Sequence, residues 1–210
     1  FHEEGFFQLH TPIITGSDAE GAGEMFKVTT LDLDNIPKTK EDTTDYSKDF
    51  FGKPSNLTVS GQLEAELGAM ALGQVYTFGP TFRAENSNTS RHLAEFWMIE
   101  PEVAFADLKD NMDLAERCIK YVLKYVLEQG DEDLAFLENR KIQEEKTLPE
   151  KDRSTRPLRE MLKLVVDSEF INMTYTEVID TLMSSKPYKK KKFKFPVEWG
   201  VDLQSEHERW

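Results

Sequence analysis

Cysteine is almost absent from the sequence: Cys118 is the only one among 210 residues. A single cysteine cannot form a disulfide within the chain, so the sequence predicts a protein of a reducing compartment, the cytoplasm. Because Cys118 falls in an apolar helical stretch, we expect it to be a small buried side chain. No apolar run approaches the roughly 20 residues of a membrane-spanning helix, and no secretory signal is recognisable, so we expect no association with a membrane.

Positive charge is also scarce, since the formal net charge is −13. Such a chain does not coat nucleic acid through bulk electrostatics, although it can hold a single RNA end in a local basic cleft. The one dense basic cluster comprises Lys186 and residues 189–192, and we interpret it as a solvated loop. The length suffices for one sizeable core, and the content of 39% hydrophobic and 31% charged residues is typical of a soluble globular domain.

Residues 75–105 predict two extended segments joined by a polar loop at 86–90. The loop is rich in Asn and Ser, which favour turns because their side chains bond nearby backbone groups. The first segment ends in Arg83 and Glu85, and the second carries His92 and Phe96. The pattern indicates an antiparallel hairpin whose polar groups face a cleft.

The chemistry of these side chains suits a nucleotide. Arg83 offers a planar fork of donors for a phosphate oxygen, and Arg91 and His92 can neutralise the rest of a triphosphate. Phe96 offers a ring face for a flat base, and Glu85 can accept a hydrogen bond from the nucleotide. Taken singly, these residues are equally compatible with an ordinary surface hairpin; taken as an ordered string, they favour the nucleotide site.

The ordered string resembles motif 2 of the class II aminoacyl-tRNA synthetases, in which Arg-x-Glu and a variable loop precede Arg-His-x-x-Glu-Phe. The matching residues are Arg83, Glu85, Arg91, His92, Glu95 and Phe96. The segment FRAENSNTSRHLAEFW is similar to the corresponding segment of the aspartyl/asparaginyl subgroup. The resemblance implies an α+β fold with an antiparallel sheet flanked by helices. It also implies an enzyme that activates an amino acid with ATP and Mg²⁺ and esterifies the terminal adenosine of a tRNA.

The resemblance implies catalytic, ATP-binding and tRNA-contacting roles for residues of the hairpin. It implies that Arg83 is catalytic, by neutralising charge on the α-phosphate, and that ATP is bound by Arg83, Glu85, Arg91, His92 and Phe96. The motif 2 loop is expected to meet the tRNA acceptor end through Asn86, Ser87, Asn88 and Thr89.

The first residues predict the end of an amphipathic helix that breaks at Gly5, followed by a strand that carries Pro12. This pattern resembles the second half of motif 1, which builds the dimer interface of the family. We therefore expect a homodimer with Pro12 at its interface. The opening of the motif 1 helix and an upstream anticodon-binding barrel are not recognisable in the sequence.

Amino-acid recognition is expected on two further segments. The loop SDAEGAGEMFKV is mobile and acidic by composition, and Glu20 resembles the glutamate that lies near the substrate ammonium. The segment SGQLEAELGAMALG predicts a helix with Ser60 as its N-cap. The resemblance places the amino acid against Glu20, Ser60, Gln62, Glu66 and Glu95.

Positions 65 and 66 bear on specificity. The aspartyl enzymes have a lysine at the first of these, which holds the substrate carboxylate, whereas this chain has Ala65 followed by Glu66. A carboxylate accepts hydrogen bonds from an amide NH₂ but repels a second carboxylate. The pair therefore resembles the asparaginyl pattern, with asparagine and tRNA(Asn) as substrates; the alternative is that Glu66 is an ordinary exposed helix residue.

The remaining chain predicts an insertion loop at 31–53, a mostly helical part at 107–185 and a return towards the sheet at 186–210. We expect helices at 107–129, with Gly130 as the stop, and then at 134–145, 157–170 and 174–182; the last begins with a capping box of Thr174 and Glu177. The carboxylates of Asp202, Glu206 and Glu208 with His207 can be interpreted as metal ligands, but a charged strand-to-helix junction is favoured, and no metal ligand is assigned.

Motif 3, which supplies a second arginine at the adenine, and the GEIxGG-type segment, which supplies carboxylates for Mg²⁺, are not found. We therefore expect that this chain alone does not catalyse ATP–pyrophosphate exchange. Two alternatives stay open: a tRNA-independent, amide-forming relative such as an asparagine synthetase of this fold, and a non-catalytic truncated paralogue used for dimerisation or binding.

Overall fold

The computed structural model describes residues 1–210 except 20, 22, 87–91, 150–152, 154–155 and 209–210. The chain divides into two compact units, Phe1–Lys109 and Asp110–Trp210, which are described separately. Within the described residues, no helix combines the length and the apolar character needed to cross a membrane.

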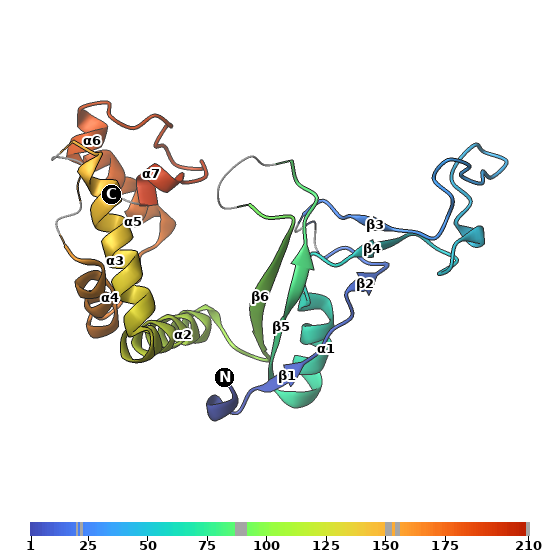
Figure 1. Cartoon of the computed structure of the whole chain (residues 1–210), viewed down its shortest axis with the longest axis horizontal. Helices are drawn as coiled ribbons and strands as arrows, with labels where there is room; N and C mark the ends of the chain where they lie inside the picture. Colours follow the sequence, from blue (N-terminus) through green and yellow to red (C-terminus); the bar gives the residue numbers. More distant parts are fainter. Residues whose placement is uncertain (20, 22, 87–91, 150–152, 154–155, 209–210) are drawn as a thin grey trace. The chain divides into compact units, whose positions relative to one another are not determined.

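The first unit contains two small sheets and one α-helix (Figure 1). Its elements are η1 His2–Glu4, β1 Phe7–Leu9, β2 Ile14–Thr15, β3 Lys27–Val28, η2 Tyr46–Lys48, β4 Ser55–Leu57, α1 Gln62–Leu72, β5 Gln74–Phe82 and β6 Glu95–Val103. The sheet orders are β1-β5-β6 and β2-β4-β3. The predicted antiparallel hairpin is confirmed as β5 and β6, which pair over their full lengths.

The first predicted strand differs from expectation in two ways. It is divided into β1 and β2, with Pro12 between them, because proline has no N–H to donate to a strand ladder. In addition, β1 pairs with β5 in parallel. The long connection between these two strands, which includes α1, allows them to run in the same direction. The predicted break at Gly5 is confirmed, since Gly5 ends η1 with φ 85°.

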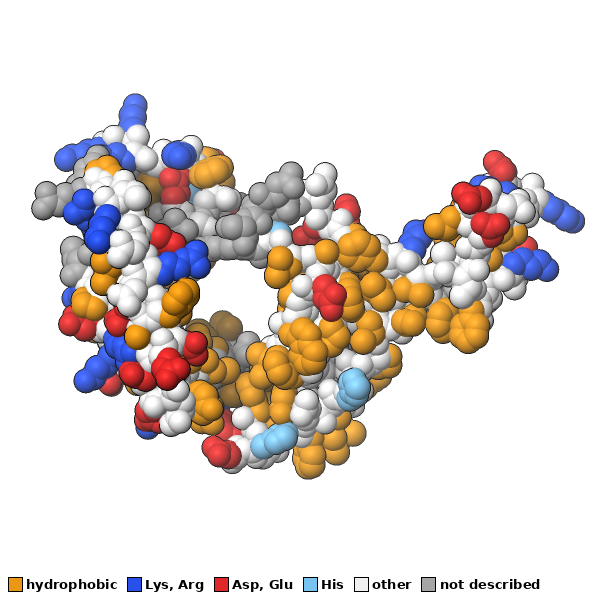
Figure 2. Space-filling view, viewed as in Figure 1, with side chains coloured by type: hydrophobic (Ala, Val, Ile, Leu, Met, Phe, Trp, Pro, Cys, Tyr) orange, Lys and Arg blue, Asp and Glu red, His pale blue; other side chains and the backbone are white. Residues whose placement is uncertain are grey.

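The β5–β6 hairpin has two unlike faces because side chains alternate along each strand. One face packs on α1, where Val75 forms a core with Ala65 and Ala69. Register places Thr77 beside Glu100 and Thr81 beside Phe96 on this face. On the other face, Phe78 and Trp97 contact each other with ring centroids 5.2 Å apart and are about half exposed. Figure 2 shows hydrophobic side chains gathered over this part of the molecule.

Residues 31–53 form an arm that contains η2 and an isolated bridge between Lys38 and Thr44. Asp49 holds the base of the arm, although it is only 7% exposed. Its carboxylate accepts hydrogen bonds from the Thr29 hydroxyl at 2.5 Å, from the Thr30 hydroxyl and N–H at 2.8 and 3.0 Å, and from the Phe50 N–H at 2.6 Å. These bonds, led by that from Thr29, lower the pKa of Asp49 from 3.8 to about 2.

The second unit is helical in the described residues. Its elements are α2 Leu108–Gln129, α3 Asp131–Lys146, α4 Leu158–Asp167, α5 Tyr175–Ser184, α6 Lys186–Lys189 and α7 Ser205–Glu208. The capping box of Thr174 and Glu177 is confirmed. The predicted stop at Gly130 is confirmed, since α2 ends at Gln129; Gly130, with φ −99°, is also the N-cap of α3. Cys118 is partly exposed rather than buried.

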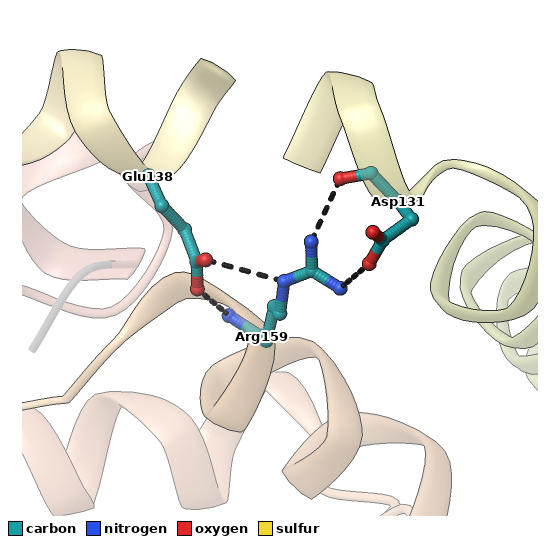
Figure 3. A network of polar contacts seen from close by, with 3 residues as sticks. All are labelled: Asp131, Glu138 and Arg159. Atoms are coloured by element: carbon teal, nitrogen blue, oxygen red, sulfur yellow. Dashed lines mark hydrogen bonds and ion pairs between the residues drawn. The ribbon is translucent and has the colours of Figure 1, made fainter. Parts of the chain in front are cut away.

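Arg159 joins the start of α4 to α3 (Figure 3). Its guanidinium donates to the Asp131 carboxylate at 2.7 Å and to the Asp131 carbonyl at 2.8 Å. It also donates to Glu138 at 3.2 Å, and the Arg159 N–H bonds to the same carboxylate at 3.1 Å. These bonds, led by that to Asp131, raise the pKa of Arg159. They connect two helices whose intervening segment is partly outside the described residues.

We predict that Asp49→Asn loosens the base of the arm, because an amide nitrogen would then face a hydroxyl or N–H donor. Hydrogen exchange at the Thr30 and Phe50 amides should be roughly tenfold faster at neutral pH, whereas Asp32→Asn, in the exposed part of the arm, should leave both unchanged. Because the pKa of Asp49 is lowered in the fold, the protection is present above pH 3.8 and is lost as the pH falls through about 2. Equal exchange in Asp49→Asn and the parent would contradict this role.

Candidate functional site

The centre of the candidate site is Glu100, on the face of β6 that is directed to α1. Its carboxylate accepts hydrogen bonds from the Ser60 hydroxyl, from the Gly61 N–H at 3.1 Å and from the Thr77 hydroxyl at 3.0 Å. Gly61 has to lack a side chain here, because a Cβ would lie 2.9 Å from the Thr11 hydroxyl and 3.0 Å from that of Thr77. Glu100 was not predicted as a site residue. Its position was a usable signal, because Phe96, Met98 and Glu100 are spaced two apart and therefore share one face of the strand.

The start of α1 differs slightly from the predicted one. Gly61, not Ser60, is the N-cap residue. The Ser60 hydroxyl nevertheless performs the bonding expected of a cap, because it accepts from the Gln62 N–H at 3.0 Å while it donates to Glu100. Ser60 is 6% exposed, and its hydroxyl makes one hydrogen bond as a donor and one as an acceptor.

Gln62 and Glu66 form a pair one turn apart on α1. The Gln62 side-chain amide donates to the Glu66 carboxylate at 2.8 Å. Glu66 is exposed, whereas Ala65 is fully buried in the core with Ala69 and Val75. Glu66 therefore keeps carboxylate lone pairs for a further donor, and the small Ala65 fits the packing between α1 and β5.

Three carboxylates lie in this region: those of Glu66, Glu100 and Glu102. The pKa of Glu102 is raised, first by burial and then by the negative charges of Glu66 and Glu100. Among the described residues, no lysine or arginine forms an ion pair with any of the three. The region therefore favours cations and hydrogen-bond donors and disfavours an additional carboxylate.

Arg83 and Phe96 stack at the other end of the same face. The Arg83 guanidinium carbon lies 5.4 Å from the centroid of the Phe96 ring, within the range of a cation–π contact. One terminal nitrogen of Arg83 is 4.0 Å from the Met98 sulfur. The Arg83 Nε is buried without a hydrogen-bond partner among the described residues. A buried donor without a partner is unusual, and a bound oxygen would satisfy it.

The segment that contains Gly23 packs against Arg83. A Cβ at Gly23 would lie 2.8 Å from a carboxylate oxygen of Glu85 and 3.1 Å from the Cγ and Cδ of Arg83, so glycine allows the close approach. The Ala84 N–H donates to the Glu24 carbonyl at 2.7 Å. Residues 23–24 therefore border the aliphatic part of the Arg83 side chain.

The other predicted site residues have mixed positions. Glu85, Asn86 and His92 are exposed beside the hairpin loop. Glu95, paired with Phe82, lies on the opposite face of β6 from Phe96 and Glu100, so the structure does not bring it to the three carboxylates. Pro12 is exposed and lines a small cavity with Thr81 and Glu100. The remaining predicted residues lie outside the described residues: Glu20, Ser87, Asn88, Thr89 and Arg91.

The described residues contain no group of three or more His, Cys, Asp and Glu placed to hold a metal ion. His207, considered above as a ligand, is 3% exposed and accepts from the Gln204 N–H through Nδ1 at 3.0 Å. Glu206 accepts from the N–H groups of Lys194 and Phe195, both at 2.8 Å. These two side chains therefore serve local packing of the second unit.

Known proteins resemble the whole chain. It is 60% identical over 210 residues to an asparagine–tRNA ligase of Cytophaga hutchinsonii and 59% identical to one of Desulfitobacterium hafniense. In both comparisons all of this chain is covered, and it spans 42% of the relative's length. Asparaginyl-tRNA synthetase from Pyrococcus horikoshii, solved with asparaginyl-adenylate, matches with a TM-score of 0.67 and 27% identity over 99% of this chain and 37% of that one.

The family model described as tRNA synthetases class II (D, K and N) matches residues 1–210. This match agrees with the motif 2 hairpin and with the α+β architecture of the structural relative. The chain belongs to the class II tRNA synthetases of the D, K and N group.

Proposed function

We propose that the protein carrying this chain is an asparagine–tRNA ligase, which activates asparagine with ATP and transfers it to tRNA(Asn). The observation that carries the proposal is the group formed by Glu66 of α1 with Glu100 and Glu102 of β6, beside the hairpin face that also holds Phe96 and Arg83. Support comes from the relatives at 60% and 59% identity, which are asparagine–tRNA ligases, and from the P. horikoshii enzyme solved with asparaginyl-adenylate.

In the first step, a carboxylate oxygen of asparagine attacks the α-phosphorus of ATP in line. The new oxygen–phosphorus bond forms as the bond to the bridging oxygen breaks, and pyrophosphate leaves with the electron pair. No side-chain nucleophile takes part, so catalysis consists of positioning and charge neutralisation. Arg83 provides the neutralising charge in this chain, with its buried Nε and its terminal nitrogens directed to phosphate oxygens.

Phe96 provides a ring for the adenine beside that guanidinium. Glu85 and His92, with Arg91, complete the ATP contacts. Mg²⁺ takes oxygen ligands, but the described residues offer no set of their own to hold a metal ion. In the full-length protein, Mg²⁺ would bind together with ATP.

The amino acid lies over the start of α1. Glu100 attracts its ammonium, and the bonds from Ser60, Gly61 and Thr77 hold this carboxylate in one orientation. Gln62 and Glu66 meet the other polar groups, with Glu66 accepting from the asparagine side-chain amide; the resemblance to the family also assigns Glu20 to the ammonium. Aspartate is rejected because its side chain would bring a further negative charge to this region.

The second step transfers the asparaginyl group from the adenylate to a hydroxyl of the terminal adenosine of tRNA, and AMP leaves. Residues of the hairpin loop contact the acceptor end: Asn86, Ser87, Asn88 and Thr89. We further propose a homodimer in the cytoplasm, with the exposed Pro12 in the interface.

The direct test is ATP–pyrophosphate exchange by the full-length protein with asparagine or aspartate, followed by aminoacylation of tRNA(Asn). We expect exchange with asparagine, little exchange with aspartate, and stable charging of the tRNA. Preference for aspartate would refute the amino-acid assignment. Aspartate-dependent adenylate formation that releases asparagine when ammonia is added, without tRNA charging, would instead support the amide-forming alternative.

We predict that Arg83→Ala lowers the rate of asparagine activation by roughly a hundredfold, which corresponds to the loss of one charge-stabilising donor, about 3 kcal/mol. Arg83→Lys should retain more activity because the charge stays, but less than the parent because the planar fork is lost. Arg159→Lys, in the helical unit, is the matched control and should leave exchange unchanged. Near-normal exchange in Arg83→Ala would remove the phosphate role.

We predict that Glu66→Gln relaxes the choice between asparagine and aspartate. Glutamine can still accept from Gln62, so α1 is retained, but the repelling charge is gone. The ratio of the two kcat/KM values should fall by at least roughly tenfold, since discrimination is a difference between transition-state affinities. Glu64→Gln on the same helix is the control. A ratio that is the same in Glu66→Gln and the parent would show that Glu66 does not select the amino acid.

A further inference from the structure

The second unit carries a concentrated basic surface that the activation site does not use. Six of the 26 basic residues of the chain lie within nine positions that contain no acidic residue, although the chain as a whole has a net charge of −13. We call this segment the lysine turn; its lysines are Lys186, Lys189, Lys190, Lys191, Lys192 and Lys194. All six are exposed.

The lysines of the lysine turn are exposed, as the sequence predicted, but its backbone is partly helical rather than a loop throughout. Its first part is α6, capped by the buried Ser185, whose hydroxyl accepts from the Tyr188 N–H at 3.2 Å. Lys191 then adopts a left-handed conformation with φ 51°, which is uncommon for a residue other than glycine. The Lys192 N–H bonds back to the Pro187 carbonyl at 2.9 Å and closes the turn.

The C-terminal end of the lysine turn packs on the hydrophobic core of the second unit. Phe193 packs on the core formed by Ile179, Leu182 and Val197, and its ring lies 5.0 Å from that of the buried His207. The Glu206 carboxylate accepts hydrogen bonds from the N–H groups of Lys194 and Phe195, both at 2.8 Å. The backbone is thus fixed at both ends, so the lysine side chains extend outward. Figure 2 shows Lys and Arg side chains around the end of this unit where Figure 1 labels α6.

The charges of the lysine turn have no neutralising partner in the part of the second unit that the structure describes. Among the described residues, none of its six lysines forms an ion pair with a carboxylate. Like charges one helical turn apart, such as those of Lys186 and Lys190, repel each other and destabilise the helical conformation. A polyanion removes this repulsion, and release of its counterions favours binding.

We infer that the lysine turn binds the sugar–phosphate backbone of tRNA, as a contact separate from that of the hairpin loop at the acceptor end. The inference rests on the proposed function, which supplies the polyanion. RNA is favoured over other anionic partners because phosphates follow one another along its backbone, as the exposed ammonium groups do along the turn. Phe195, 51% exposed beside Lys194, adds a ring on which an unpaired base can stack.

The test compares two triple variants of the full-length protein. Lys190→Gln/Lys192→Gln/Lys194→Gln removes charge from the lysine turn and spares the strained Lys191. Lys48→Gln/Lys124→Gln/Lys163→Gln removes the same charge from exposed lysines elsewhere. Binding of labelled tRNA(Asn) is measured by fluorescence anisotropy from about 50 to about 200 mM KCl, and asparagine-dependent ATP–pyrophosphate exchange is measured in parallel.

We expect the lysine-turn variant to bind tRNA roughly tenfold more weakly near physiological salt. The slope of log K against log salt should become shallower by about 2 to 3, since each lost phosphate contact removes about 0.9 from it. The control variant should keep the parent's slope, and both should retain amino-acid activation, which needs no tRNA.

An unchanged slope in the lysine-turn variant overturns the inference, as does an equal loss in both variants, which would indicate bulk charge alone. Loss of binding to vesicles that contain phosphatidylglycerol, with tRNA binding intact, overturns it in favour of a membrane surface. If the parent activates asparagine but the variant binds tRNA normally, only the role of the lysine turn fails. If the parent does not activate asparagine, the proposed function fails independently of this result.

Discussion

The fixed carboxylate of Glu100 is the interaction on which the arrangement of the first unit depends. It joins β6 to β5 through Thr77 and to the start of α1 through Ser60 and Gly61. A carboxylate that is partly removed from water needs hydrogen-bond donors, and the Glu100 carboxylate accepts from three of them. The same bonds determine where the first turn of α1 lies over the sheet, and hence where Gln62 and Glu66 are presented.

The electrostatic character of the hairpin face follows from that arrangement. At one end, Glu100 and Glu102 of β6 lie near Glu66 of α1, and burial, followed by the charges of Glu66 and Glu100, raises the pKa of Glu102. At the other end, Arg83 lies over Phe96 with a buried donor. An adenylate has an ammonium at one end and a phosphate nearer the other, so this separation of charge along a single face suits it.

Local signals in the sequence predicted much of this structure. The capping box of Thr174 and Glu177 and the β5–β6 hairpin depend on residues close together in the chain, and both are confirmed. Glu100 could not be found in this way, because its partners are 23, 39 and 40 positions away. The stop at Gly130 is confirmed as well, because α2 ends at Gln129, and the structure adds that Gly130 is also the N-cap of α3.

The lysine turn shows the same limit. Its composition indicates a solvated loop, and its lysines are exposed as expected, whereas the packing of Phe193 and the bonds accepted by Glu206, 11 and 12 positions away, could not be predicted from it. Residues 65 and 66 show the opposite case. Resemblance to the family identified both as informative, and the structure adds that Ala65 is part of the core while Glu66 remains exposed.

The most direct test of the account is hydrogen–deuterium exchange of the full-length protein with and without a non-hydrolysable asparaginyl-adenylate analogue. If the face between Glu100 and Arg83 is the adenylate site, exchange should slow in peptides that cover residues 60–66, 83–85 and 96–102, while the arm at 31–53 keeps its rate. Slower exchange confined to other segments, with these three unchanged at saturating analogue, would contradict the account.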